Sequence, residues 1–296
     1  MNARDITLAL GGRWYGRYGL TFCPAHPNTR TPALRLRDGA EGRLLAICAV
    51  GCSFTDVVAA LRERGLLEDR GRAAAPDPLA EMRRRKAERE ERERDTRRAR
   101  AVLAETVPIA DTLAERYLRA RAITGPLPDS LRFHPACFHG PTATRHPAMV
   151  AAVVIEGEVE PVAVHRTRLA EPGRKADLEP NRMMLGPCAG GAVRLAHGAG
   201  PLVVAEGIET ALSLRDGVVD RDPNIWAALS TSGVSGLRLP KSVGELLIAP
   251  DGDAPGRKAA EVLASRAYAT GWSVRILPPP GEGLDWNDAA RMEGVE

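Results

Sequence analysis

The acidic residues in the last third of the chain follow short apolar segments. Glu206 comes directly after the apolar run 202–205, and Asp251 and Asp253 follow a second apolar run, 246–249. Short, fully apolar runs are typical of parallel strands that are buried on both faces. Ligands bind at the carboxyl ends of such strands, so we expect the three carboxylates to converge at one edge of a sheet.

Three converging carboxylates repel one another unless a cation lies between them. Two like charges at about 4 Å repel by ~1 kcal/mol even in bulk water. All-oxygen ligation suits Mg²⁺ or Mn²⁺, so the three side chains are the predicted catalytic residues and ligands of a catalytic metal ion. Asp285 and Asp288, after the last predicted strand, are further candidate ligands. The alternative is an ordinary Asp-Gly turn and an acid at a helix N-terminus, but two such motifs on matched strands favour the metal site.

A second set of side chains has the spacing of a metal centre. Cys23 and His26 are separated by two residues, and Cys48 and Cys52 by three. Three thiolates and one imidazole form the ligand set of a tetrahedral structural Zn²⁺, with no position left open for chemistry. The alternative is three buried thiols and a histidine that is hydrogen-bonded elsewhere. The two spaced pairs favour zinc, which would stabilise a block with little core of its own.

The other sequence features indicate a globular protein of the cytoplasm. The 296 residues are 44% hydrophobic and 27% charged, and 41 basic against 38 acidic residues give a net charge of +3. The longest apolar run, 148–155, is shorter than the roughly 20 residues of a membrane span. Asp5 and the lack of an apolar stretch at the N-terminus argue against secretion, and five cysteines argue against a disulfide scaffold.

Composition and periodicity divide the chain into four parts. Residues 1–70 should form a small β domain with a hairpin at 33–47 and a helix that begins after Ser53. Residues 71–105 should form a charged linker helix, because 81–100 contain ten basic and six acidic residues and almost no apolar ones. Residues 106–198 should contain a helix at 111–121, a loop-rich stretch at 126–147 and two strands at 148–155 and 160–168. Residues 199–296 alternate strands and helices, which predicts a small parallel α/β sheet.

These motifs resemble those of bacterial-type DNA primases. The order Glu206-Gly207, Asp251-x-Asp253 and a late acidic motif at 285–288 is similar to the Toprim domain of such primases, topoisomerases and related nucleases. Cys23-Pro-x-His26, Thr31-Pro32-Ala33-Leu34 and Cys48 to Cys52 resemble their N-terminal, CHC2-like zinc-binding domain. The segments 164–169, 184–186 and 191–195 resemble the region before Toprim in phage, plasmid and integrative-element primases. The implied fold is a zinc-ribbon-like β domain, a charged linker helix and a primase core that ends in a Toprim α/β domain.

The resemblance implies template-directed synthesis of short RNA primers on single-stranded DNA. Glu206, Asp251 and Asp253 would hold the Mg²⁺ or Mn²⁺, and Glu206 is alternatively the general base. Ribonucleoside triphosphates, single-stranded DNA and a separate replicative helicase are the implied partners, since the sequence has no Walker A motif. The alternatives are a non-catalytic Toprim and zinc protein that binds DNA in replication or recombination, and a Toprim nuclease.

Basic and aromatic residues complete the expected site. A nucleotide and template groove would be lined by His165, Arg166, Arg168, Lys175, Arg182 and Arg194, although each could equally be a solvated surface charge. Single-strand binding favours charges interleaved with rings, as in Arg13, Trp14, Tyr15, Arg17 and Tyr18. For these rings the alternative is packing against the zinc hairpin.

Overall fold

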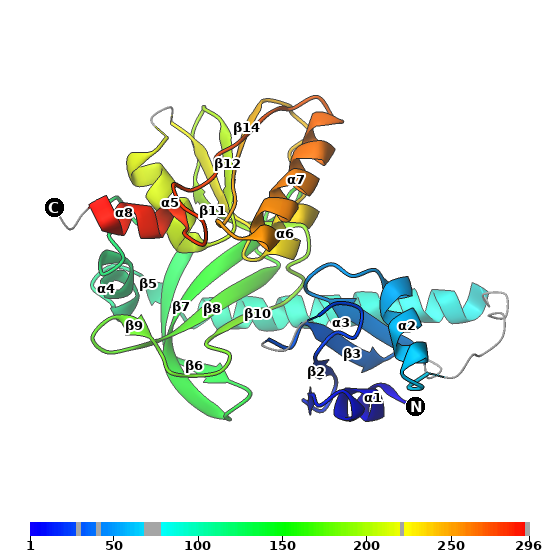
Figure 1. Cartoon of the computed structure of the whole chain (residues 1–296). Coiled ribbons are helices and arrows are strands. Elements are labelled where there is room, and N and C mark those ends of the chain that lie inside the picture. Colours follow the sequence, from blue (N-terminus) through cyan, green and yellow to red (C-terminus); the bar gives the residue numbers. More distant parts are fainter. Residues whose placement is uncertain (28–30, 40–42, 68–77, 220–221, 294–296) are drawn as a thin grey trace. The chain divides into compact units, whose positions relative to one another are not determined.

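The computed structural model describes residues 1–27, 31–39, 43–67, 78–219 and 222–293. They form two compact units, Met1–Glu88 and Arg89–Glu296, whose elements are labelled in Figure 1. The start of the predicted linker, 71–77, and the tip of the predicted hairpin, 40–42, lie outside the described residues. The boundary between the units falls inside helix α3 (Pro78–Ala104), so the second half of the predicted linker belongs to the second unit.

The first unit is a four-stranded antiparallel sheet with two helices. The sheet has the order β1-β2-β3-β4, and the predicted hairpin is confirmed because β3 pairs with β4. Leu34 and Leu36 are buried on one face of β3, while Arg35 and Arg37 are exposed on the other. The elements are α1 (Ala3–Ala9), β1 (Arg13–Trp14), β2 (Gly19–Thr21), β3 (Leu34–Asp38), β4 (Leu44–Cys48) and α2 (Phe54–Glu63).

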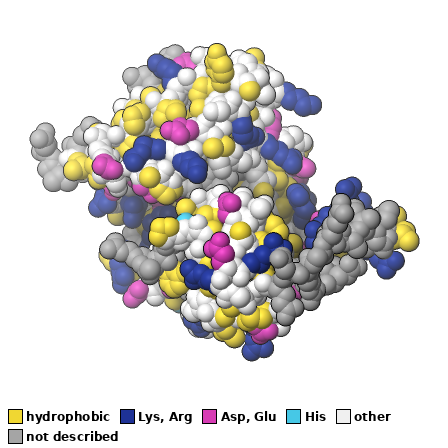
Figure 2. Space-filling model, turned by 45° about the vertical axis from the view of Figure 1, so that its right-hand side comes forward, with side chains coloured by type: hydrophobic (Ala, Val, Ile, Leu, Met, Phe, Trp, Pro, Cys, Tyr) yellow, Lys and Arg dark blue, Asp and Glu magenta, His cyan; other side chains and the backbone are white. Residues whose placement is uncertain are grey.

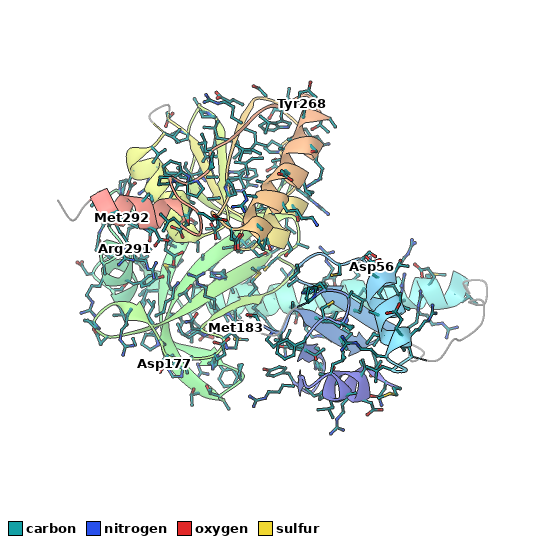
Figure 3. All side chains as sticks on the ribbon, viewed as in Figure 1. Asp56, Asp177, Met183, Tyr268, Arg291 and Met292 are labelled. Atoms are coloured by element: carbon teal, nitrogen blue, oxygen red, sulfur yellow. The ribbon has the colours of Figure 1, made fainter. Side chains whose placement is uncertain are left out.

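Helix α2 begins where the sequence predicts it. The Ser53 hydroxyl accepts a hydrogen bond from the backbone N–H of Asp56 (3.1 Å), and the Asp56 carboxylate accepts one from the backbone N–H of Ser53 (3.3 Å). This reciprocal capping box satisfies two backbone donors at the helix start, and Figure 3 labels Asp56 there. Val57 and Leu61 are then one turn apart and buried.

Helix α3 changes character along its length. Its exposed side chains pair along the helix, for example Glu81 with Arg85 (3.0 Å) and Arg89 with Glu93 (3.3 Å). Such exposed pairs contribute only a few tenths of a kcal/mol each. Near the C-terminal end Ala99 is buried in a small core with Cys137, Ala148, Val150 and Val164 of the second unit. Within the described residues, no helix has both the length and the apolar character needed to cross a membrane.

The second unit begins with an antiparallel half-sheet. Helix α4 (Leu113–Arg119) lies within the predicted helix, but the prediction of a loop-rich 126–147 is wrong. Strand β6 and the start of β7 occupy more than half of that stretch, and the register of their pairing shifts between His134 and Cys137. A β-bulge allows Pro135 to lie within a strand. The proline and the bulge interrupt the alternation of buried and exposed side chains, so the strand could not be recognised from the sequence. The strands are β5 (Val107–Pro108), β6 (Leu131–His139), β7 (Thr144–Ile155), β8 (Ala163–Ala170), β9 (Arg174–Lys175), β10 (Arg182–Leu185) and β11 (Gly191–Ala196).

The sheet continues into the predicted parallel half without a break. Strand β11 pairs antiparallel with β13, and the parallel strands follow in the order β13-β12-β14-β15. The two apolar runs are therefore neighbouring strands, with Leu202 opposite Leu246 and Ala205 opposite Ala249. The elements are β12 (Leu202–Ala205), α5 (Ile208–Gly217), β13 (Asn224–Ala227), α6 (Thr231–Gly236), β14 (Glu245–Ala249), α7 (Ala254–Tyr268), β15 (Ser273–Ile276) and α8 (Trp286–Glu293).

The core of the second unit spans both halves of the sheet. One buried cluster joins Tyr117 and Leu118 of α4, Leu169 of β8 and Leu212 of α5. A second cluster fills the space between the parallel strands and α7. In Figure 1 the antiparallel strands β6, β7, β8 and β10 lie below β11, β12 and β14 of the same sheet. Ala205 and Ala249, the last residues of β12 and β14, belong to the same buried cluster as Tyr117 and Leu118 of α4.

Candidate active site and metal centre

The carboxylates that the sequence predicts to converge lie at one edge of the sheet. Strands β12 and β14 are adjacent and in register, so Glu206 and Asp251 leave the sheet from the same end. Asp253 is the N-cap of α7, and its Oδ1 accepts a hydrogen bond from the Gly256 backbone N–H at 2.7 Å. The backbone at the Asp-Gly-Asp turn is held by Gly252, whose N–H donates to Leu284 O at 2.8 Å. Backbone hydrogen bonds to Gly283 and Leu284, directly before the late acidic motif at 285–288, therefore hold the Asp-Gly-Asp turn in place.

The electrostatics of this edge favour a cation. Burial, followed by the charges of Asp251 and Asp253, raises the pKa of Glu206 to about 7. Burial, followed by the charges of Asp285 and Asp253, raises the pKa of Asp251 to about 6. Asp251 Oδ1 is buried and has no hydrogen-bond partner among the described residues. A divalent metal ion with oxygen ligands would relieve this repulsion and would give the unpartnered oxygen a cation to bind. Among the described residues, the carboxylate oxygens of this edge do not form a group of three or more with all atoms within 4.8 Å of one another.

Asp285 and Asp288 have a structural role at this edge as well as a charge. Asp285 Oδ1 accepts hydrogen bonds from the backbone N–H groups of Asn287 (2.7 Å) and Asp288 (2.9 Å), which caps α8. Asn287 is fully buried, and its Nδ2 donates to Arg121 O (2.7 Å) and Ser213 Oγ (3.0 Å). The late acidic motif therefore fixes α8 to α5 and to the end of α4, while both aspartates raise the pKa of Asp251.

The basic residues expected to line the groove fall into two groups. Against the larger effect of burial, the negative charge of the buried Glu209 raises the pKa of His165 and of Lys175, and Arg182 lies 3.7 Å from the same carboxylate. The charge of Arg182 also lowers the pKa of both Glu206 and Asp251. Burial lowers the pKa of His165 to about 4, so its imidazole is neutral at physiological pH. Burial also lowers the pKa of Lys175 to about 8. Arg182 and Lys175 therefore supply the positive charge near the carboxylate edge, and His165 is a neutral neighbour.

The other three lie elsewhere in the second unit. Side chains alternate along β8, so Arg166 and Arg168 are on the opposite face from His165. Arg166 donates to Met184 O at 3.2 Å, and Arg168 is fully buried and donates to Phe138 O at 2.9 Å. Arg194 pairs with Glu156 at 2.8 Å and its guanidinium lies over the Trp226 ring. These three arginines therefore bond to backbone oxygens and to Glu156 of the same unit, which is a structural role.

Two residues of the edge were not singled out from the sequence. Glu209 is buried in the first turn of α5, and the Tyr117 hydroxyl of α4 donates a hydrogen bond to it. Arg182 Nη2 lies 3.7 Å from the same carboxylate oxygen. The only signal in the sequence was an acid three residues after Glu206. It resembles an ordinary first-turn acid that interacts with the helix dipole.

The predicted zinc ligands form one cluster in the first unit. One ligand atom each of Cys23, His26, Cys48 and Cys52 lies within 4.8 Å of the others. His26 Nδ1 is 3.1 Å from Cys52 Sγ and 3.8 Å from Cys48 Sγ. Zinc binds sulfur at about 2.3 Å and imidazole nitrogen at about 2.0 Å in tetrahedral sites, so this cluster fits the ion. It is a Cys3His cluster of the kind found in zinc ribbons.

The protonation of the thiols differs across the cluster. Burial raises the pKa of Cys23 to about 12 and also raises that of Cys52. Burial opposes ionisation of Cys48 too, but backbone N–H groups of Cys52 and Val50 lower its pKa below the ordinary value. Those N–H groups stabilise a thiolate, which is the form that ligates metals. All five cysteines of the chain are free thiols.

The aromatic and arginine stretch of the first unit is stacked and accessible. The rings of Tyr15 and Tyr18 stack with centroids 5.4 Å apart. The Arg35 guanidinium lies 4.2 Å from the Tyr18 centroid and that of Arg13 lies 5.5 Å from the Tyr15 centroid. Trp14 packs partly against the core of this unit, as in the packing alternative. In Figure 2, Lys and Arg side chains are spread over the visible surface with Asp and Glu between them.

Two family models match the second unit. Residues 93–195 match a domain of unknown function, DUF7146, and residues 201–296 match a Toprim domain. No curated protein matches the sequence.

Solved structures of primases are similar at low identity. The zinc-binding and RNA polymerase domains of the Aquifex aeolicus primase match at 16% identity and a TM-score of 0.39, over 99% of this chain and 80% of that one. The primase fragment of the bacteriophage T7 primase-helicase matches at 14% identity and a TM-score of 0.35, over 93% and 98%. The chain is thus a mixed α/β protein with a Cys3His cluster near its N-terminus, and its residues 201–296 form a Toprim domain.

Proposed function

We propose that this protein is a DNA primase, which synthesises short RNA primers on a single-stranded DNA template. The observation that supports this most directly is the carboxylate edge of the Toprim domain. Burial and then the charges of Asp251 and Asp253 raise the pKa of Glu206. Burial and then the charges of Asp285 and Asp253 raise that of Asp251. The charge of Arg182 lowers both pKa values. A cation balances such a cluster, and a phosphate ester would bind between that cation and the guanidinium.

Each residue of the edge has a proposed role. Glu206, Asp251 and Asp253 would hold Mg²⁺ or Mn²⁺, and Asp285 and Asp288 would add negative charge to the site. The metal supplies Lewis-acid stabilisation of phosphoryl oxygens when bound. Glu206 has a pKa of about 7 without metal, which also suits a general base near neutral pH. Lys175 and Arg182, from β9 and β10, are the proposed nucleotide ligands on the other side of the edge.

The first unit is proposed to bind one structural zinc ion. Cys23, His26, Cys48 and Cys52 leave no open coordination position, so the metal would stabilise the fold and take no part in the chemistry. Folding energy from the metal matters here because the unit has few large buried side chains. The stacked Tyr15 and Tyr18, flanked by Arg13 and Arg35, are a proposed contact for template bases.

The wider assignment is also part of the proposal. A separate replicative helicase as partner, membership of the phage, plasmid and integrative-element branch of primases, and a cytoplasmic location rest on the sequence resemblance.

The test is primer synthesis by the full chain. The protein is incubated with single-stranded DNA, labelled ribonucleotides and either Mg²⁺ or Mn²⁺, and the products are separated by length and treated with RNase. We expect short RNase-sensitive products that disappear with Asp251→Asn. Asp177→Asn is the matched control, because Asp177 is an exposed aspartate in the loop between β9 and β10 (Figure 3). DNA binding without products would indicate a non-catalytic protein, and metal-dependent DNA cleavage would indicate a nuclease.

A further inference from the structure

A fully buried carboxylate lies where the Toprim domain meets the preceding domain. Glu209 is in the first turn of α5, and its side chain is only 8% exposed. The Tyr117 hydroxyl of α4 donates a hydrogen bond to Glu209 Oε1, and Arg182 Nη2 of β10 is 3.7 Å from that oxygen. Buried carboxylates are rare unless they are paired, and Glu209 has two partners. The question is what such a buried, paired carboxylate does at this position.

The charge of Glu209 is maintained by its neighbours. Burial alone would raise its pKa, but Arg182, the Tyr117 hydroxyl and Lys175 together lower it, so the carboxylate is ionised. Arg182 and Lys175 repel each other, and Glu209 is the anion that attracts both. The side chain of Arg182 remains 45% exposed while one of its nitrogens faces Glu209. The rest of its planar fork is free for a second anion.

We propose that Glu209 is a positioning residue that holds Arg182 beside the carboxylate edge, where Arg182 and Lys175 bind the triphosphate of an incoming nucleotide. This inference rests on the proposed primase function and adds a residue that does not touch the substrate. Burial and neighbouring aspartates raise the pKa of Glu206 and of Asp251. Glu209 differs from them because its carboxylate already contacts a hydroxyl and a guanidinium. Without the anion, the two cations would repel each other and move apart.

Glu209→Gln tests this role because it keeps the shape and can still accept from Tyr117, but removes the charge. We expect the KM for ribonucleotides to rise about tenfold while kcat changes less than about threefold, as for the loss of an interaction that serves substrate binding. Equilibrium binding of ATP should weaken by a similar factor, and Mn²⁺ affinity without nucleotide should stay unchanged. Glu156→Gln is the matched control, because it removes the carboxylate partner of Arg194 in another pair and should leave the KM unchanged.

Three outcomes would overturn the proposal. An unchanged KM and ATP affinity in a folded Glu209→Gln protein would make Glu209 only a structural bridge. A loss of Mn²⁺ affinity would make it a metal ligand. If Glu209→Gln does not fold, Tyr117→Phe decides, since it removes the hydroxyl that orients the carboxylate and should raise the KM severalfold; an unchanged KM would reject the role. ATP binding is measured without primer synthesis, so the two proposals can fail separately. A wild-type protein that makes no primers would refute the proposed function, and the ATP affinities of wild type and Glu209→Gln would still decide the role of Glu209.

Discussion

Neutralising one carboxylate at the Toprim edge should stabilise the metal-free protein. The pKa of Asp251 is raised from 3.8 to about 6, and each pKa unit corresponds to about 1.4 kcal/mol, so the ionised side chain costs the folded state roughly 3 kcal/mol. Asp251 is partly exposed, and solvent screening reduces the expected gain of Asp251→Asn to about 1–2 kcal/mol at neutral pH. The folded protein binds this proton more tightly than the unfolded chain, so the stability of metal-free wild type should rise as the pH falls through about 6. Glu206 acts in the same direction around pH 7.

Urea denaturation of the second unit measures this effect. The buffer contains no Mg²⁺ or Mn²⁺ and no chelator, so that any zinc in the first unit is left in place. Asp251→Asn should be more stable than wild type without metal and should gain less than wild type when Mn²⁺ is added. Asp177→Asn, at an exposed loop position, should behave as wild type. The reasoning is refuted if Asp251→Asn is no more stable than wild type without metal, or if Mn²⁺ stabilises both proteins equally.

Three further outcomes follow from the structure. Asp253→Asn should reduce primer synthesis by orders of magnitude, measured against wild type on one template; wild-type rates would remove Asp253 from the catalytic set. Metal analysis should find one zinc per chain in wild type and less in Cys48→Ser, whose circular dichroism should show loss of the first unit; a zinc-free wild type, prepared without chelator, would contradict the site. Limited proteolysis should cut before Ala99 and leave a stable C-terminal fragment, because Ala99, Val102 and Leu103 pack on the second unit; a fragment that begins after Leu103 would show that this packing is absent.

The parts of the structure that could be predicted depend on local patterns. The parallel half of the sheet follows from fully apolar runs such as 202–205, and the pairing of Leu202 with Leu246 confirms the adjacency that the metal site requires. The zinc cluster follows from two spaced ligand pairs. Strand β6 could not be predicted in the same way, because Pro135 and a register shift interrupt its alternation.

The cationic side of the site could be predicted only in part. His165, Lys175 and Arg182 gather at the carboxylate edge, whereas Arg166 and Arg168 belong to the other face of β8. Sequence shows that these residues are basic and close together in the chain, but the face that each occupies depends on the exact start of the strand. The prediction began the strand three residues early. Glu209 could not be predicted as a site residue, because its partners Tyr117 and Arg182 are distant in sequence and contact it only in the folded protein.

The pairing of β11 with β13 joins the regions matched by the two family models into one continuous sheet. The border between the two matches lies between residues 195 and 201, yet strand pairing crosses it, with Arg194 opposite Trp226 and Val193 opposite Ala227. A fragment cut at this border would expose an unprotected strand edge, with Trp226 stripped of the arginine that covers its ring. Such an edge pairs with other chains, so a Toprim fragment of residues 201–296 should aggregate where the longer protein does not. We expect the region from Arg89 onward to unfold as one cooperative block rather than as two.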